Sequence, residues 1–116
     1  MTVIKLTPDF AVSSQLSPAD LENLRDAGFK AVICTRPDAE ADDQPSFEAI
    51  GDAARNLGLE ARHLPVQNGA IDDAQVAAFA EIFADLPKPV VGYCRTGNRA
   101  GMLWTMSASI RAALGG

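Results

Sequence analysis

The chain has 116 residues, a formal net charge of −5 and 47% hydrophobic residues. This length supports one hydrophobic core, so we expect a single domain over residues 1–116. The negative charge argues against a nucleic-acid partner, because the phosphates of nucleic acids would be repelled. The sequence has no run of roughly 18 apolar residues and no long apolar segment at its start. Neither a membrane partner nor a signal peptide is therefore expected.

Two cysteines and one histidine are the only residues of their kinds. Two cysteines without an export signal indicate a reducing, cytoplasmic setting with free thiols. One histidine and two distant cysteines do not favour a zinc site, so we expect no bound metal.

The first part of the chain predicts short strands followed by a helix and a buried strand. Residues 3–6 and 10–13 are predicted strands that flank a Thr-Pro-Asp turn. Ser17 is the expected N-cap of the first helix, because a proline follows it at the first helical position. The apolar segment 29–35 predicts a buried, parallel strand. The acidic residues 38–44 predict a surface loop.

The rest of the chain continues the alternation. Helices are expected over residues 46–57, 72–86 and about 99–114, and strands over 59–66 and 89–93. This order predicts an α/β fold with a mainly parallel central sheet flanked by helices. Ligands of such sheets bind outside the carboxyl ends of the strands.

Segment 89–101, PVVGYCRTGNRAG, combines a strand, a short loop and a helix N-terminus. The N–H groups of such a loop and the helix dipole attract an anion. With two arginines nearby, the same field should lower the pKa of Cys94 and favour its thiolate. We therefore predict that Cys94 is a nucleophile and that Arg99 grips an anionic substrate. The other residues of the predicted anion loop are Arg95, Thr96, Gly97, Asn98 and Ala100.

Three further residues are candidates with two interpretations each. Arg36 follows a predicted strand and lies either on the surface or in the same pocket. Cys34 is favoured as a core residue, with a role as resolving partner of Cys94 as the alternative. Asp72 is favoured as an N-terminal helix residue, with a role as general acid as the alternative.

Two resemblances bear on function. The loop CRTGNR resembles the active-site loop CRxGxR of single-domain rhodaneses. The segments SSQLSPADLENLRDAGFKAVICTRPDAE, HLPVQNG and PVVGYCRTGNRAG resemble the beta-lactamase hydrolase-like protein phosphatase-like domains, over nearly the whole chain. This resemblance implies a fold similar to dual-specificity protein phosphatases. Members occur alone or fused to a metallo-beta-lactamase-like persulfide dioxygenase or a sulfide-oxidising flavoprotein, which implies phosphatase chemistry by fold and sulfur transfer by context.

The chain departs from the protein tyrosine phosphatase pattern, HCx5R followed by Ser or Thr. Tyr93 precedes Cys94, and only four residues separate Cys94 from Arg99. Ala100 replaces the hydroxyl residue. Asn68 is the residue nearest to the usual sequence position of the catalytic acid, and its amide cannot donate a proton in that role.

These departures favour a cysteine-dependent sulfurtransferase of the rhodanese type. Cys94 would take sulfane sulfur from thiosulfate or a persulfide and hold it as a persulfide, without a metal or organic cofactor. The first alternative is a phosphatase of the dual-specificity type that hydrolyses a phosphoester through a phosphocysteine. The second is a non-catalytic sensor or binding domain. A persulfide dioxygenase acting in trans is a further expected partner.

Overall fold

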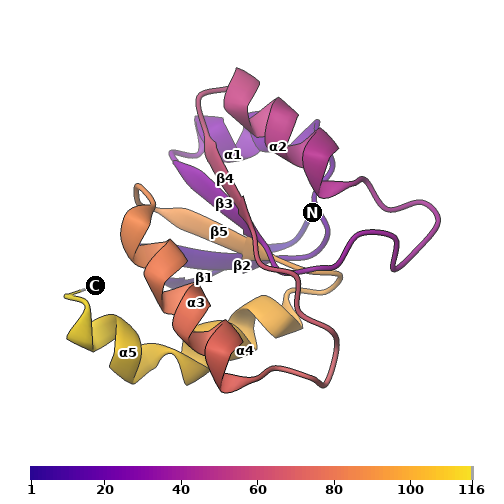
Figure 1. The fold of residues 1–116 in the computed structure, drawn as a ribbon. Coiled ribbons are helices and arrows are strands. Elements are labelled where there is room, and N and C mark those ends of the chain that lie inside the picture. The colour runs from indigo at the N-terminus through magenta and orange to yellow at the C-terminus, as the bar shows by residue number, and fades with distance from the viewer. Residues whose placement is uncertain (116) are drawn as a thin grey trace.

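One five-stranded sheet forms the centre of the computed structural model, which describes residues 1–115 (Figure 1). The strands are β1 (Val3–Thr7), β2 (Phe10–Ser13), β3 (Ala31–Cys34), β4 (Glu60–His63) and β5 (Val90–Tyr93). They lie in the order β1-β2-β5-β3-β4. β1 pairs with β2 in antiparallel fashion, whereas the pairs β2–β5, β5–β3 and β3–β4 are parallel. The predicted α/β fold with a mainly parallel sheet is confirmed.

Helices cover both faces of the sheet (Figure 1). They are α1 (Asp20–Asp26), α2 (Phe47–Asn56), α3 (Asp73–Asp85), α4 (Asn98–Met106) and α5 (Ala108–Ala113). α1 and α2 pack on one face, and α3 and α4 pack on the other. Within residues 1–115, no helix is both long enough and apolar enough to cross a membrane.

The central strand β5 supplies side chains to both halves of the core. Val91 and Tyr93 belong to the cluster under α1 and α2, whereas Val90 belongs to the cluster under α3 and α4. This follows from the alternation of side chains along a strand. Gly92 lies against the ring of Phe10, where an added Cβ would come within 2.7 Å of the ring. The strand is therefore buried on both faces, as expected for a parallel strand.

Side-chain caps define where the helices start. Ser46 caps α2 by accepting the N–H of Ala49 at 3.1 Å. At the first helix, Ser17 and Asp20 exchange hydrogen bonds between side chain and backbone. The predicted N-cap position is therefore wrong, because Ala19 is the N-cap of α1, although Ser17 and Asp20 do form the reciprocal pair one turn earlier.

The predicted single helix over residues 99–114 is wrong, because it is divided into α4 and α5 at Ser107. The Ser107 hydroxyl donates to the carbonyl of Trp104 at 3.1 Å, and the Arg111 guanidinium donates to the same carbonyl at 2.8 Å. A serine that bonds back to the preceding turn bends a helix. Hydrophobic spacing does not report this local competition.

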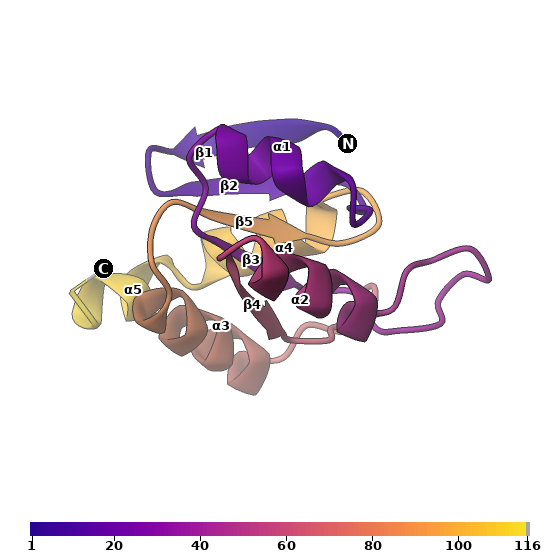
Figure 2. The same ribbon diagram turned by 90° about the horizontal axis from the view of Figure 1, so that it is seen from above.

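The parallel register brings four chain segments to one edge of the sheet. Ser13 and Cys34 are both paired with Tyr93, and Cys34 is also paired with His63. The four strands therefore end in one row, and the loops that follow them meet. One of these loops, residues 36–46, leaves β3 and extends away from the body before α2 (Figure 2). Binding sites of parallel sheets lie at such an edge.

Candidate active site

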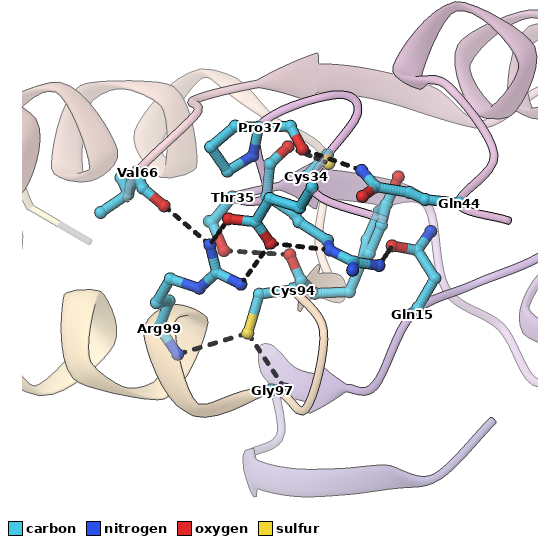
Figure 3. A network of polar contacts seen from close by, with 12 residues as sticks. Gln15, Cys34, Thr35, Pro37, Gln44, Val66, Cys94, Gly97 and Arg99 are labelled. Atoms are coloured by element: carbon cyan, nitrogen blue, oxygen red, sulfur yellow. Dashed lines mark hydrogen bonds and ion pairs between the residues drawn. The ribbon is translucent and has the colours of Figure 1, made fainter. Parts of the chain in front are cut away.

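The loop after β5 turns around the sulfur atom of Cys94 (Figure 3). Sγ accepts the backbone N–H of Gly97 at 3.1 Å and that of Arg99 at 3.3 Å. The residue is only 1% exposed. Backbone N–H groups that converge on one point form a concave anion-binding site. The loop is therefore built to hold negative charge on this sulfur.

The pKa of Cys94 lies below that of an ordinary thiol. Burial alone would raise this pKa, but the backbone N–H groups of Thr96, Gly97, Arg99 and Ala100 lower it by more. Hydrogen bonds to the charged form of a group favour that form. The local backbone therefore favours the thiolate form of Cys94, as the sequence predicts.

The two cysteines are expected to differ in reactivity. Burial raises the pKa of Cys34, whose Sγ contacts the carbonyl oxygen of Arg36 at 3.4 Å. We expect iodoacetate to alkylate Cys94 with a midpoint at a lower pH than that of a free cysteine measured in parallel, while Cys34 stays unlabelled in the folded protein. Peptide mapping by mass spectrometry over a pH series measures both. Equal labelling of the two thiols would contradict this expectation.

Gly97 gives the loop its shape. Its φ is +96°, a left-handed conformation, and it stands directly before α4. A Cβ at this position would lie 3.3 Å from the carbonyl oxygen of Ser13. Glycine adopts this conformation without steric cost. The N–H of Gly97 reaches the sulfur because the residue can turn here.

Gly97→Ala is expected to lower the free energy of unfolding by about 1–2 kcal/mol, because a side chain is strained in the left-handed region. It should also slow alkylation of Cys94, since the N–H donor is displaced. Gly101→Ala is the matched control, because an added Cβ meets no atom within 4 Å there. That helical position should gain up to about 1 kcal/mol. Urea unfolding of both variants tests the difference, and equal losses would count against it.

Arg99 leaves the start of α4 and its guanidinium is fixed on two sides (Figure 3). Nη1 donates to Glu40 Oε2 at 2.6 Å and to the carbonyl of Val66 at 2.9 Å, and Nη2 donates to Glu40 Oε1 at 2.9 Å. This is a bidentate pair, which fixes the plane of the group. The pKa of Arg99 is raised, mainly by Glu40 and in smaller part by Cys94. The guanidinium therefore lies within electrostatic reach of the thiolate.

Glu40 is a site residue that the sequence pattern does not predict. Its carboxylate also accepts the Nε–H of Arg36 at 2.9 Å, so it bridges two arginines. The hydrogen bond from Arg99 is the main reason that the pKa of Glu40 falls to about 2, against the opposing effect of burial. The sequence places it in an acidic surface loop, and its spacing of four residues from Arg36 is the only signal of a partner.

Three arginines gather at a pocket of about 410 Å³ on this edge of the molecule. Its lining residues are Arg36, Glu40, Ala41, Asn68, Arg95 and Arg99. Arg36 is buried, with 4% of its surface exposed, and donates to Gln15 Oε1 at 3.0 Å. The interpretation of Arg36 as a surface residue is therefore wrong. Three guanidinium groups and one carboxylate make this pocket locally positive in a protein of net charge −5, which suits a small anion.

Three other predicted candidates do not line the arginine pocket, although Thr96 and Asn98 belong to the Cys94 loop. Asp72 accepts the N–H of Gln75 at 2.8 Å and forms a capping box at the start of α3, outside the arginine pocket. Thr96 and Asn98 line a different pocket of about 690 Å³ between β1, β2 and α4. Within residues 1–115, no three His, Cys, Asp or Glu side chains are grouped so as to hold a metal ion.

Comparison with known proteins points to one class of enzyme. A family model described as beta-lactamase hydrolase-like protein, phosphatase-like domain, matches residues 3–111. A crystal structure of a candidate phosphatase from Neisseria meningitidis is 36% identical, with a TM-score of 0.83 over 90% of this chain and 74% of that one. TpbA of P. aeruginosa, solved in complex with pTyr, has a TM-score of 0.67 at 20% identity over 90% of this chain and 60% of its own, and supports the fold alone.

The expectation of a rhodanese-type sulfurtransferase is wrong. The matched family is phosphatase-like, and the 36% identical structure from Neisseria meningitidis is described as a candidate phosphatase. That expectation rested on the short Cys94–Arg99 spacing, on Tyr93, Ala100 and Asn68 in place of the usual phosphatase residues, and on the sulfur context of the family. In the structure this loop still directs the N–H groups of Gly97 and Arg99 at the sulfur. The phosphatase alternative agrees better with these findings.

Curated relatives complete the comparison. The beta-lactamase hydrolase-like protein of Xylella fastidiosa is 32% identical over 110 residues, which are 95% of this chain and 26% of the relative. The chain thus spans about a quarter of the length of the curated relatives it matches. Because the family model extends over residues 3–111, the chain belongs to the family of beta-lactamase hydrolase-like protein, phosphatase-like domains.

Proposed function

We propose that this domain is a cysteine-dependent phosphatase that hydrolyses a small phosphoester through a phosphocysteine on Cys94. One observation carries the proposal: a sulfur that accepts two backbone N–H groups stands on the same loop that supplies Arg95 and Arg99 to the arginine pocket. A nucleophile with a lowered pKa and an anion site on one short loop is the arrangement that covalent phosphoryl transfer requires.

In the first step the Cys94 thiolate attacks the phosphorus atom. The S–P bond forms, the bond from phosphorus to the leaving oxygen breaks, and the electron pair departs with that oxygen. The transferred group carries its charge on three equatorial oxygens, so the protein acts mainly by positioning and electrostatic stabilisation. The loop N–H groups and the Arg99 guanidinium are the donors for these oxygens.

In the second step water attacks the phosphocysteine. A P–O bond forms, the S–P bond breaks and the thiolate returns, while the proton from water passes to solvent. The low pKa of Cys94 assists this step, because a stable thiolate is a good leaving group. The same backbone donors therefore serve both halves of the reaction.

Glu40 contributes by fixing Arg99 rather than by touching the phosphorus. Its two oxygens hold the guanidinium in one plane at 2.6 and 2.9 Å. A pre-oriented arginine loses less conformational entropy when it binds an anion. We assign Glu40 as a positioning residue.

The direct test is release of inorganic phosphate from p-nitrophenyl phosphate by the reduced protein. We expect saturable hydrolysis that inorganic phosphate and vanadate inhibit competitively, because all three occupy the same anion site. Prior alkylation of Cys94 should abolish the activity. Activity that survives complete alkylation of this thiol would refute the proposal.

A further inference from the structure

We propose that the substrates are phosphoryl compounds whose leaving group departs as a stable anion, namely phosphoanhydrides, acyl phosphates and acidic aryl phosphates. This inference rests on the proposed phosphatase function. Breaking the P–O bond puts negative charge on the leaving oxygen, and an alcohol leaves well only if a general acid protonates it. The groups that line the arginine pocket carry positive charge but hold no proton suited to that transfer.

Glu40 is the carboxyl group that lines the pocket, and both of its oxygens are occupied. Oε1 accepts from Arg36 Nε at 2.9 Å and from Arg99 Nη2 at 2.9 Å, and Oε2 accepts from Arg99 Nη1 at 2.6 Å. Two guanidinium groups in contact hold this group as a carboxylate. An ionised carboxylate accepts hydrogen bonds and has no proton to give.

The remaining lining groups are three arginines, Asn68 and Ala41. Arginine keeps its proton in proteins, and a neutral amide does not act as an acid. Among the described residues that line this pocket, none can therefore protonate a leaving alkoxide near neutral pH. Asn68, the residue nearest to the usual sequence position of the catalytic acid, is one of these lining residues.

Two titratable groups outside the pocket, Asp72 and His63, are held in structural roles. The Asp72 carboxylate accepts the N–H of Gln75 at 2.8 Å in the capping box of α3. The Nε2 atom of His63 is bonded to the carbonyl of Arg36 at 2.9 Å, and its ring stacks on Phe47 at 4.6 Å. Neither side chain lines the pocket.

The positive charge of the pocket fits a leaving group that is itself an anion. Arg36 and Arg95 line it in addition to Arg99, which binds the transferred group in the proposed mechanism. A departing phosphate or carboxylate is stabilised by guanidinium groups without any proton transfer. In this step the S–P bond forms, the bridging P–O bond breaks, and the electron pair stays on the departing oxygen.

The test is a leaving-group series measured as kcat/KM. It contains aryl phosphates from acidic nitrophenols to phenol, together with acetyl phosphate and glycerol phosphate. We expect kcat/KM to fall by about tenfold for each unit rise in leaving-group pKa. Without a general acid, the leaving oxygen carries its full negative charge in the transition state, so the rate follows the stability of that anion. Acetyl phosphate should rank with the best substrates and glycerol phosphate last. Rates that hardly depend on leaving-group pKa would overturn the inference.

A pair of variants at Asn68 tests the absence of a general acid independently. Asn68→Asp introduces a carboxyl group at the pocket, and Asn68→Ala removes the amide without adding an acid. We expect a flatter leaving-group dependence in Asn68→Asp than in the wild type and no flattening in Asn68→Ala. A wild-type slope already as flat as that of Asn68→Asp would show that the native site holds a working acid.

The series separates this inference from the proposed function. If acidic and basic leaving groups are lost at similar rates in a Cys94-dependent reaction, the phosphatase function stands and only the substrate class fails. If no compound in the series gives Cys94-dependent phosphate release, both fail together.

Discussion

Cys94→Ser is expected to lower kcat/KM for p-nitrophenyl phosphate by at least about 10⁴-fold. The sulfur is the atom on which the loop N–H groups of Gly97 and Arg99 converge at 3.1 and 3.3 Å. A serine hydroxyl is nearly isosteric but does not ionise near neutral pH, so the fold should remain while the nucleophile is lost. The measurement is steady-state phosphate release at pH 7.

Cys34→Ala is the matched control for this variant. Cys34 is buried in the core on the α1 and α2 side, and burial raises its pKa. Its removal should cost some stability but leave the activity of the folded protein within a few-fold of wild type. A loss in Cys34→Ala as large as that in Cys94→Ser would contradict the assignment of Cys94 as the nucleophile. It would favour the alternative in which the two thiols work together.

Arg99→Lys is expected to lower kcat/KM by about 10³-fold although the charge is kept. The native guanidinium satisfies Glu40 and the Val66 carbonyl through Nη1 and Nη2. An ammonium group has three N–H donors, so it cannot hold Glu40 in a bidentate pair, satisfy the Val66 carbonyl and bind phosphoryl oxygens as well. The loss should fall mainly on kcat, since these contacts strengthen as charge develops in the transition state.

Arg25→Lys is the control for the change of side chain. Arg25 pairs with Asp26 on the surface, where its side chain is 45% exposed, and such pairs contribute little. The activity of Arg25→Lys should equal that of the wild type. Retention of more than a tenth of the wild-type activity in Arg99→Lys would show that a point charge suffices at this position.

Local patterns predict the framework of the site well. The β-branched run before Cys94 and the helical spacing after it identify the strand, loop and helix, and β5 and α4 are found there. The parallel order of the strands then predicts that other loops meet the Cys94 loop. Arg36 and Asn68 come from two such loops and line the same pocket as Arg99.

The tertiary contacts are what the sequence does not predict. Glu40 lies 59 residues from Arg99 along the chain, in a loop whose composition suggests only solvent exposure. Arg36 is buried where it donates to Glu40 and to Gln15, and the contact with Gln15, 21 residues earlier, is not predicted by the sequence. The chemical class was missed because the loop residues fit either reaction: a thiolate held by backbone N–H groups beside an arginine can take up sulfur or a phosphoryl group.

A rapid-quench experiment tests the central claim most directly. The reduced wild-type protein is mixed with acetyl phosphate, quenched during turnover, and its intact mass and Cys94 peptide are measured beside Cys94→Ser. We predict a gain equal to one phosphoryl group, located on Cys94 and absent from the variant. Phosphate release by the wild type with no phosphoryl group on this cysteine at any quench time would contradict covalent catalysis by Cys94.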